Sequence, residues 1–213
     1  MKKTLTFIIF PLLIVLTNCS KTTIATEPQS YEIPAKNAND KTTGDVAENS
    51  ANAIKADVIQ KIKQNIINFT IEYTFSLDNG EISIYRFFDE NSIEYEGGAQ
   101  INIINGLYEI QFNDFAKNYE DASFVVHSFS GGYSNDIPKK LFYAIFGIIN
   151  DSQIAEIDIY FNDGSLASVI VGDRTMYAYS RTDKIISIQK IIALDKGGNA
   201  IYQYPPYPPK KLN

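Results

Sequence analysis

The spacing of apolar residues changes once along this chain, from a period near four to a period of two. The four-residue period covers residues 53–68 and is carried by Ile54, Val58, Ile59, Ile62, Ile66 and Ile67. Such a stripe is typical of a helix that packs one face against a sheet. We therefore predict a helix over residues 53–68, with Asn52 as its N-cap.

From residue 70 onward, apolar and polar side chains alternate, which is typical of strands with one solvated face. Asp78-Asn79-Gly80 separates one pair of alternating segments, residues 70–77 and 82–88. Asn105-Gly106 separates another pair, residues 100–104 and 107–112. Asn-Gly favours tight hairpin turns because both residues tolerate a positive φ. Two hairpins are therefore predicted, with a further strand at residues 124–129.

The last third of the chain is predicted to be β throughout. Residues 141–149 form a continuous apolar run, short enough for a strand buried on both faces. Further short strands are expected at residues 154–161, 166–171, 175–179, 184–194 and 201–204. The fold class predicted is α+β, mostly antiparallel β, with one N-terminal amphipathic helix packed on a sheet. A small β-sandwich follows, for which an Ig-like arrangement is one option.

The N-terminus has the pattern of an export signal. Lys2 and Lys3 precede an apolar run over residues 7–16, which is too short for a membrane-spanning helix. The run ends just before Cys19, the only cysteine, and this stretch resembles a bacterial lipobox. That resemblance implies removal of residues 1–18 and acylation of Cys19, for example with palmitate. Asn18 departs from the small residue usual before the cysteine. An uncleaved anchor and a plain signal peptide are the alternatives.

The predicted lipoprotein would be held at the cell membrane by the lipid on Cys19 and would face outside the cytoplasm. Residues 19–52 are predicted to be the lipidated cysteine and a disordered tether, because they contain few large apolar side chains. The folded part is divided into a helix plus antiparallel β region at 53–138 and a β-sandwich-like region at 139–204. Residues 205–213 are expected to be a Pro-rich tail, in which residues 205–209 form a polyproline II segment that is either a solvated end or an SH3-type ligand.

Composition removes several classes of function. The chain has 19 basic and 25 acidic residues, a net charge of −6, which argues against nucleic-acid binding. One cysteine excludes an intramolecular disulfide and a cysteine-based zinc site. One histidine excludes metal centres that need two imidazoles. We accordingly predict no metal and no cofactor.

One stretch of the chain resembles a known group of proteins. The residues that carry the resemblance run from Phe146 to Tyr202 and include Phe146-Gly147-Ile148-Ile149-Asn150-Asp151, Asp163-Gly164 and Ala193-Leu194-Asp195. They resemble uncharacterised secreted or lipid-anchored proteins of Bacillus-like Firmicutes. The resemblance implies an extracytoplasmic bacterial protein and brings no activity, ligand or catalytic residue with it.

The residues give little sign of catalysis, and we predict that the protein is not an enzyme. His127 is the sole imidazole base, but it lies mid-strand between apolar neighbours and no G-x-S-x-G motif is present. It is predicted to be a strand histidine on a half-buried face. Glycine pairs such as Gly97-Gly98 are expected at bulges and turns.

Acidic residues cluster before residue 97, and they support an alternative function. The cluster contains Asp89, Glu90, Glu94 and Glu96. Glu94 and Glu96 share one strand face, and paired carboxyl groups can hydrolyse glycosidic bonds. The alternative is therefore a weak carboxylate-dependent hydrolase of cell-wall or exogenous polymer.

The preferred function is a binding or accessory module at the cell surface. Tyrosine is enriched at binding surfaces, and the chain has 14 of them. The candidate contact residues are Gly131, Gly132, Tyr133, Asn135, Tyr177 and Tyr179. The candidate partners are an envelope protein, a peptide or a glycan.

Overall fold

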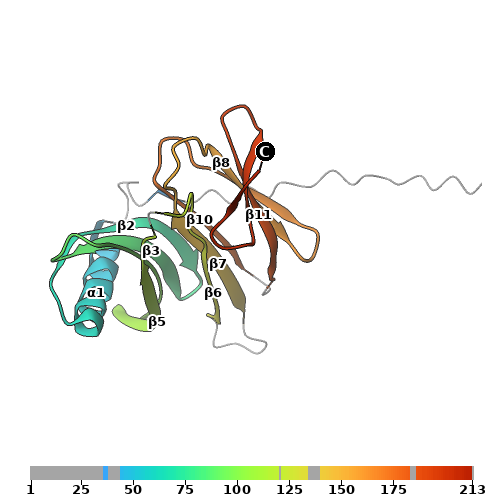
Figure 1. Cartoon of the computed structure of the whole chain (residues 1–213). Coiled ribbons are helices and arrows are strands. Elements are labelled where there is room, and N and C mark those ends of the chain that lie inside the picture. Colours follow the sequence, from blue (N-terminus) through green and yellow to red (C-terminus); the bar gives the residue numbers. More distant parts are fainter. Residues whose placement is uncertain (1–35, 38–43, 120, 134–139, 183–185, 213) are drawn as a thin grey trace, which may run out of the picture.

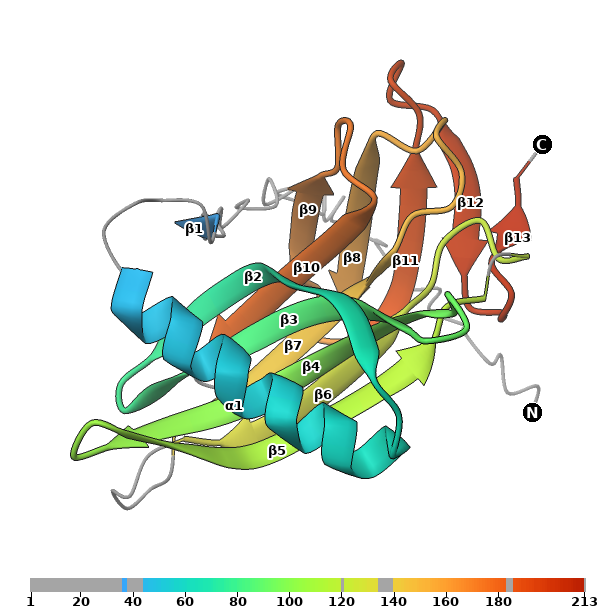
Figure 2. The ribbon, with the colours of Figure 1, turned by 90° about the vertical axis from the view of Figure 1, so that its left-hand side faces the viewer.

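In the part of the chain that the structure describes, the protein is mostly antiparallel β, with three sheets and one helix (Figure 1). The computed structural model describes residues 36–37, 44–119, 121–133, 140–182 and 186–212. The predicted signal peptide, Cys19 and residues 20–35 of the tether lie outside the described residues. The helix, the first sheet, the middle sheet and the third sheet follow one another as layers, and Figure 2 shows the helix lying across the first sheet.

Each sheet is antiparallel at every pairing. The first sheet has the order β1 (Lys36–Asn37), β2 (Ile66–Leu77), β3 (Gly80–Asp89), β4 (Glu94–Ile104) and β5 (Leu107–Lys117). The middle sheet has the order β10 (Met176–Thr182), β7 (Leu141–Ile148) and β6 (His127–Gly132). The third sheet has the order β13 (Lys210–Lys211), β12 (Ala200–Tyr204), β11 (Ile188–Leu194), β8 (Glu156–Phe161) and β9 (Leu166–Ile170).

The two predicted hairpins of the first sheet are confirmed. β2 pairs with β3 around the Asp78-Asn79-Gly80 turn, and β4 pairs with β5 around Asn105-Gly106. Both residues of the second turn have positive φ, 51° at Asn105 and 79° at Gly106, as a two-residue hairpin of this type requires. The local turn chemistry thus sets the register of both hairpins.

The helix is present but its predicted bounds are wrong. Helix α1 covers Gly44–Ile62, so it begins inside the stretch predicted to be a disordered tether. Its buried stripe continues backward from Ile54 to Ser50, whose small polar side chain is fully buried but carries no hydrophobic signal. The helix ends where Lys63 adopts a φ of 55°, and Ile66 already belongs to β2.

The central strand of the middle sheet, β7, is covered on both faces, which explains the continuous apolar run in the sequence. On one face of β7, Phe142 and Phe146 pack against Ile82 and Ile84 of the first sheet. On the opposite face, Ile145 belongs to the core shared with the third sheet. The prediction of a strand buried on both faces is confirmed, since the consecutive β7 residues from Ala144 to Ile148, which point to alternate faces of the sheet, are all buried.

One prediction near the middle of the chain needs correction. The strand expected at 124–129 is β6, which begins only at His127, while Phe124 makes an isolated bridge to Ile149. β6 and β7, adjacent strands of one sheet, lie on either side of the boundary expected at 138/139. At the end of the Pro-rich tail, after the segment predicted to be polyproline II, Lys210–Lys211 form β13 and pair with β12.

Candidate functional site

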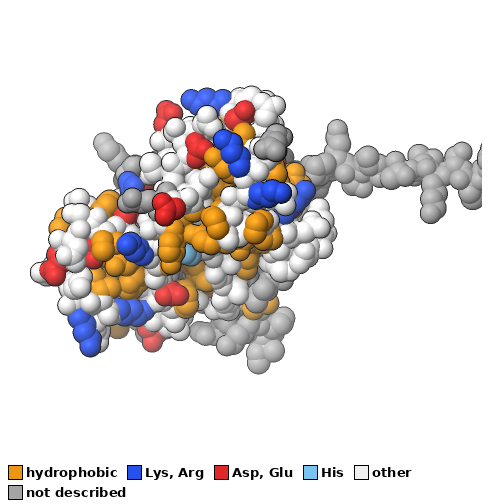
Figure 3. Space-filling model, in the orientation of Figure 1, with side chains coloured by type: hydrophobic (Ala, Val, Ile, Leu, Met, Phe, Trp, Pro, Cys, Tyr) orange, Lys and Arg blue, Asp and Glu red, His pale blue; other side chains and the backbone are white. Residues whose placement is uncertain are grey.

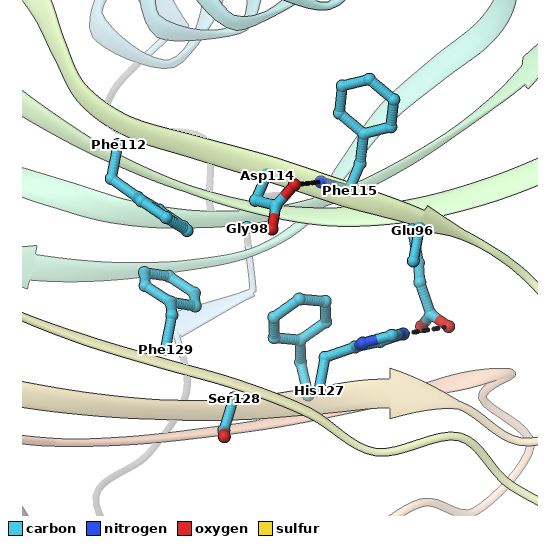
Figure 4. A pocket seen from close by; sticks show the side chains of 10 residues that line it. Glu96, Gly98, Phe112, Asp114, Phe115, His127, Ser128 and Phe129 are labelled. Atoms are coloured by element: carbon cyan, nitrogen blue, oxygen red, sulfur yellow. Dashed lines mark hydrogen bonds and ion pairs between the residues drawn. The ribbon is translucent and has the colours of Figure 1, made fainter.

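A small pocket lies where the edge of the first sheet meets the edge of the middle sheet (Figure 4). Its volume is about 80 Å³. It is lined by Glu96, Gly98, Phe112, Asp114, Phe115, Ala116, His127, Ser128, Phe129 and Phe146. Beside the pocket, β4 of the first sheet is joined to β6 of the middle sheet by a hydrogen bond from Gln100 Nε2 to the Gly132 carbonyl oxygen, at 2.9 Å.

Aromatic rings from both sheets form much of the pocket wall. Phe112 of β5 stacks on Phe129 of β6 with ring centroids 5.0 Å apart. Phe129 in turn makes an edge contact with Phe146, at 6.1 Å between centroids. Phe112 is 38% exposed, which places it at the mouth of the pocket. In Figure 3 the pale blue of the chain's single histidine shows at the surface among hydrophobic side chains.

Glu96 is the most unusual group in the pocket. Its side chain is 0% exposed, and its Oε1 lies 3.1 Å from His127 Nε2. Its other oxygen, Oε2, is buried and makes no hydrogen bond of normal geometry within the described residues. Burial raises the pKa of the Glu96 carboxyl above its ordinary value, because desolvation disfavours the charged form. The hydrogen bond and charge of His127, and the Ile148 backbone N–H, oppose this rise in pKa.

The alternation of β4 explains why Glu96 faces the pocket. Ala99 and Ile101 of β4 pack under the helix, so the residues between them and before them face the middle sheet. Glu96, Gly98 and Gln100 therefore lie on one side of the strand. A Cβ added at Gly98 would lie 2.4 Å from Phe129 Cε1, so the pocket exists only because this position is glycine.

Asp114 brings a second carboxyl group to the pocket. It lies on β5, opposite Gly98 in the register of the two strands, and Figure 4 shows its carboxylate beside that glycine. Its Oδ1 accepts a hydrogen bond from the Phe115 backbone N–H at 3.0 Å. No Lys or Arg is among the described residues that line the pocket. Two acids and a histidine therefore face an aromatic cavity with no opposing cation from the wall.

The other acids of the predicted carboxylate cluster are used elsewhere. Glu94 accepts a hydrogen bond from Asn118 Nδ2 at 2.9 Å and lies 3.7 Å from the Arg86 guanidinium. Asp89 is buried and caps a turn by accepting the backbone N–H groups of Asn91 and Ile93. Glu90 is exposed. Of this cluster, Glu96 alone reaches the pocket.

The predicted tyrosine contact surface is not formed by Tyr177 and Tyr179. Tyr177 is 0% exposed and donates a hydrogen bond to the Val125 carbonyl oxygen at 2.8 Å, and Tyr179 is 9% exposed in the same core. Both lie on β10 of the middle sheet, whose consecutive residues from Met176 to Ser180 are all buried, so they are core residues. This corrects their assignment to a contact surface.

The glycine-rich part of the predicted loop is a strand end. Gly131 and Gly132 close β6, and Tyr133 is only 8% exposed. A Cβ on Gly131 would lie 2.8 Å from Phe142 Cε1 on the neighbouring strand and 2.9 Å from Gln100 Oε1 of the first sheet, so this glycine permits close packing of the two sheets. Asn135 lies outside the described residues.

His127 is where the sequence places it, on a half-buried strand face. Its side chain is 26% exposed and its ring lies 5.4 Å from that of Phe146. What the sequence did not indicate is its partner Glu96, or the contribution of Phe112 and Asp114 from another strand. The one available signal was Gly97-Gly98, which lies inside β4 rather than at a bulge or turn, since glycine inside a strand often marks a close approach.

Comparisons with known proteins add no assignment. No protein-family model, no curated protein and no solved structure matches the chain. Within the described residues, no group of three or more His, Cys, Asp and Glu side chains is placed to hold a metal ion. No helix in that part of the chain is both long and apolar enough to cross a membrane.

Proposed function

We propose that this chain is a lipid-anchored extracytoplasmic binding protein, and that its partner inserts a small group into the pocket between β5 and β6. The position of Cys19 at the end of the apolar N-terminal run supports the anchor. The net charge of −6 supports attachment by lipid, since an acidic protein is not attracted to an anionic leaflet.

The buried Glu96 carboxyl is the observation that carries the binding proposal. A buried charge without full pairing lowers stability, and strongly perturbed carboxyl groups in pockets are concentrated at functional sites. Glu96 has Oε1 beside His127, and the Ile148 backbone N–H also favours its charged form, but its buried Oε2 makes no hydrogen bond of normal geometry within the described residues. A ligand that brings a positive charge or a hydrogen-bond donor to Oε2 would complete the site.

The size of the pocket restricts what enters it. Pockets that enclose a whole small-molecule ligand are about 300–1,000 Å³, whereas this one is about 80 Å³. A protein, peptide or glycan partner would therefore contact the rim and place only one side chain or head group inside. The exposed Phe112 supplies an aromatic rim suited to such a contact.

Hydrolysis is the second candidate, because the pocket gathers two carboxyl groups and an imidazole. Glu96 has the raised pKa expected of a general acid, and Asp114 lines the same cavity. The small volume favours binding over polymer cleavage. Release of reducing ends or peptides from purified cell wall, abolished by Glu96→Gln and by Asp114→Asn, would establish the hydrolase instead.

We also propose a β-sandwich for the middle and third sheets and a relationship to secreted bacterial proteins. The β-sandwich is supported by the core that the middle and third sheets share, and an Ig-like arrangement of it stays a proposal. Kinship with secreted Firmicutes proteins is supported only by the residues between Phe146 and Tyr202 that resemble that group.

Photocrosslinking on intact cells tests the function. p-Benzoylphenylalanine is placed at Phe112, at the pocket mouth, or at Ile170, which is 71% exposed on the far edge strand β9. We expect an adduct from position 112 that is lost when Gly98→Ala fills the pocket, and none that depends on Gly98 from position 170. Equal adducts from both positions, unaffected by Gly98→Ala, would refute the pocket as the binding site.

The anchor is tested separately. Cys19→Ser is expected to move the protein from the membrane fraction to the soluble extracytoplasmic fraction. Tight membrane attachment of the variant would refute lipidation.

A further inference from the structure

We infer that the group received by the pocket is an alkylammonium cation, either a primary amine or a methylated ammonium. This inference rests on the proposed function and adds the chemistry of the ligand. The sign of the charge follows from the wall, where Glu96 and Asp114 face the cavity and no described Lys or Arg does. An anion would meet two carboxyl groups, and the one described wall residue able to carry a positive charge, His127, has its Nε2 3.1 Å from Glu96 Oε1.

The rings around the acids favour an organic cation over a hydrated metal ion. Phe112, Phe129 and Phe146 supply π faces and edges within one cluster. A cation within about 6 Å of a ring centroid is attracted by the ring quadrupole, and most strongly when the site is desolvated. Phenylalanine rings offer no oxygen or nitrogen ligand to a metal, whereas they suit the apolar surface of an alkylated ammonium group.

The Glu96 oxygen that makes no hydrogen bond of normal geometry among the described residues, Oε2, favours an ammonium over a guanidinium as the bound group. A guanidinium binds a carboxylate best through two parallel hydrogen bonds, which occupy both oxygens. At Glu96, Oε1 lies 3.1 Å from His127 Nε2, and Oε2 is the oxygen without a hydrogen bond of normal geometry within the described residues, so a guanidinium that bonds both oxygens would compete with His127 for Oε1. A compact ammonium group can interact with a single acceptor oxygen, whereas a planar guanidinium needs two acceptor oxygens for its paired hydrogen bonds.

The volume agrees with a head group of this size. A dry cavity of roughly 150 Å³ holds benzene, and this pocket is about half as large at about 80 Å³. An ammonium or trimethylammonium group is smaller than benzene, and its substituent chain would leave past Phe112, which is 38% exposed. The ligand is therefore the end of a larger molecule, as the proposed function requires.

The single histidine provides a reporter inside the site. Selective ¹⁵N-histidine labelling of the detergent-solubilised full chain gives one pair of ring signals, because the chain has one His. Choline is titrated against 3,3-dimethylbutan-1-ol, which has the same shape without the charge. n-Butylammonium and methylguanidinium are the further probes. We expect saturable shifts of the His127 signals with choline or n-butylammonium, and at least tenfold weaker binding of the neutral alcohol and of methylguanidinium.

Variants test whether cation binding depends on the carboxyl group in the pocket or on the overall acidity of the protein. Glu96→Gln should weaken cation binding at least tenfold, and Phe112→Leu at the exposed rim should weaken it about threefold or more without disturbing the core. The matched control is Glu109→Gln, which removes the same charge from an exposed position of β5 outside the pocket. It should change the affinity less than twofold. Backbone amide spectra matching the unmodified protein establish that each variant is folded.

The results distinguish failure of the ligand class from failure of the function. Equal shifts with choline and the neutral alcohol, or no saturable shift with any cation, would overturn the ammonium assignment. If the crosslink from position 112 still depends on Gly98, the binding site stands and its ligand is of another class. If that dependence is also absent, the proposed function falls as well.

Discussion

Filling the pocket by one methyl group is the most informative substitution. Gly98→Ala would place a Cβ 2.4 Å from Phe129 Cε1 and 3.1 Å from a Phe146 ring carbon. Carbon atoms in contact lie about 3.5–4.0 Å apart, so the Phe129 ring must move by about 1 Å or more. That movement carries the ring into the pocket space or toward Phe112, on which it stacks.

The expected cost follows from overpacking. Extra methyl groups in packed cores destabilise by about 1–3 kcal/mol, and Phe129 is only partly buried, so the lower half of that range is expected. For a chain of this size, 1 kcal/mol corresponds to about 2–4 °C in Tm. We expect Gly98→Ala to lower Tm by about 2–8 °C and to reduce affinity for the pocket ligand at least tenfold.

Gly131→Ala is the matched control. Its Cβ would lie 2.8 Å from Phe142 Cε1, so it overpacks the same layer between the first and middle sheets without lining the pocket. Thermal unfolding followed by circular dichroism should show a similar loss of stability for both variants. Binding should fall only for Gly98→Ala. Undiminished binding in Gly98→Ala, or an equal loss in Gly131→Ala, would refute the pocket and favour the strand end at Gly131.

Three further substitutions test separate parts of the structure. Glu96→Gln should gain stability relative to the unmodified protein as pH rises. The raised pKa of Glu96 does not lower the free energy of unfolding below the ordinary glutamate pKa of about 4.3, and it lowers that free energy increasingly as pH rises through the folded pKa. A difference in urea unfolding that does not change with pH would contradict this expectation. Tyr177→Phe should lower the free energy of unfolding by about 1 kcal/mol, because the hydrogen bond to Val125 is lost, and should leave binding intact. Lost binding with unchanged stability would show instead that Tyr177 belongs to the contact surface. Ile54→Ala should lower the free energy of chemical unfolding by about 2–5 kcal/mol, because Ile54 is fully buried between α1 and the first sheet. A decrease of less than about 1 kcal/mol would contradict that packing.

Local chemistry made much of the fold predictable. Asn105-Gly106 specifies a tight turn by its own backbone preferences, and the alternation on either side specifies which faces are buried. The helix start was not predictable by the same means, because Ser50 is buried through its small size and carries no apolar signal. Ile66 fits the helical period and still belongs to β2, since the backbone turns at Lys63.

The site was less predictable because its members come from different sheets. Glu96 and His127 are 31 positions apart and belong to strands that do not pair, so no sequence period links them. Tyr177 and Tyr179 were misassigned because alternation shows which residues share a face but not whether a third layer covers it. That cover comes from residues such as Ile157 and Ile191 of the third sheet.

The ionisation of Glu96 is the most direct test of the central claim, that this buried carboxyl is kept to receive a cation. Its side-chain ¹³C carboxyl signal, assigned by its absence in Glu96→Gln, can be followed through a pH titration with and without choline. We expect a pKa above the ordinary glutamate value in the free protein, lowered when the cation is bound because an opposite charge favours the ionised form. An ordinary pKa that does not respond to the cation would contradict it.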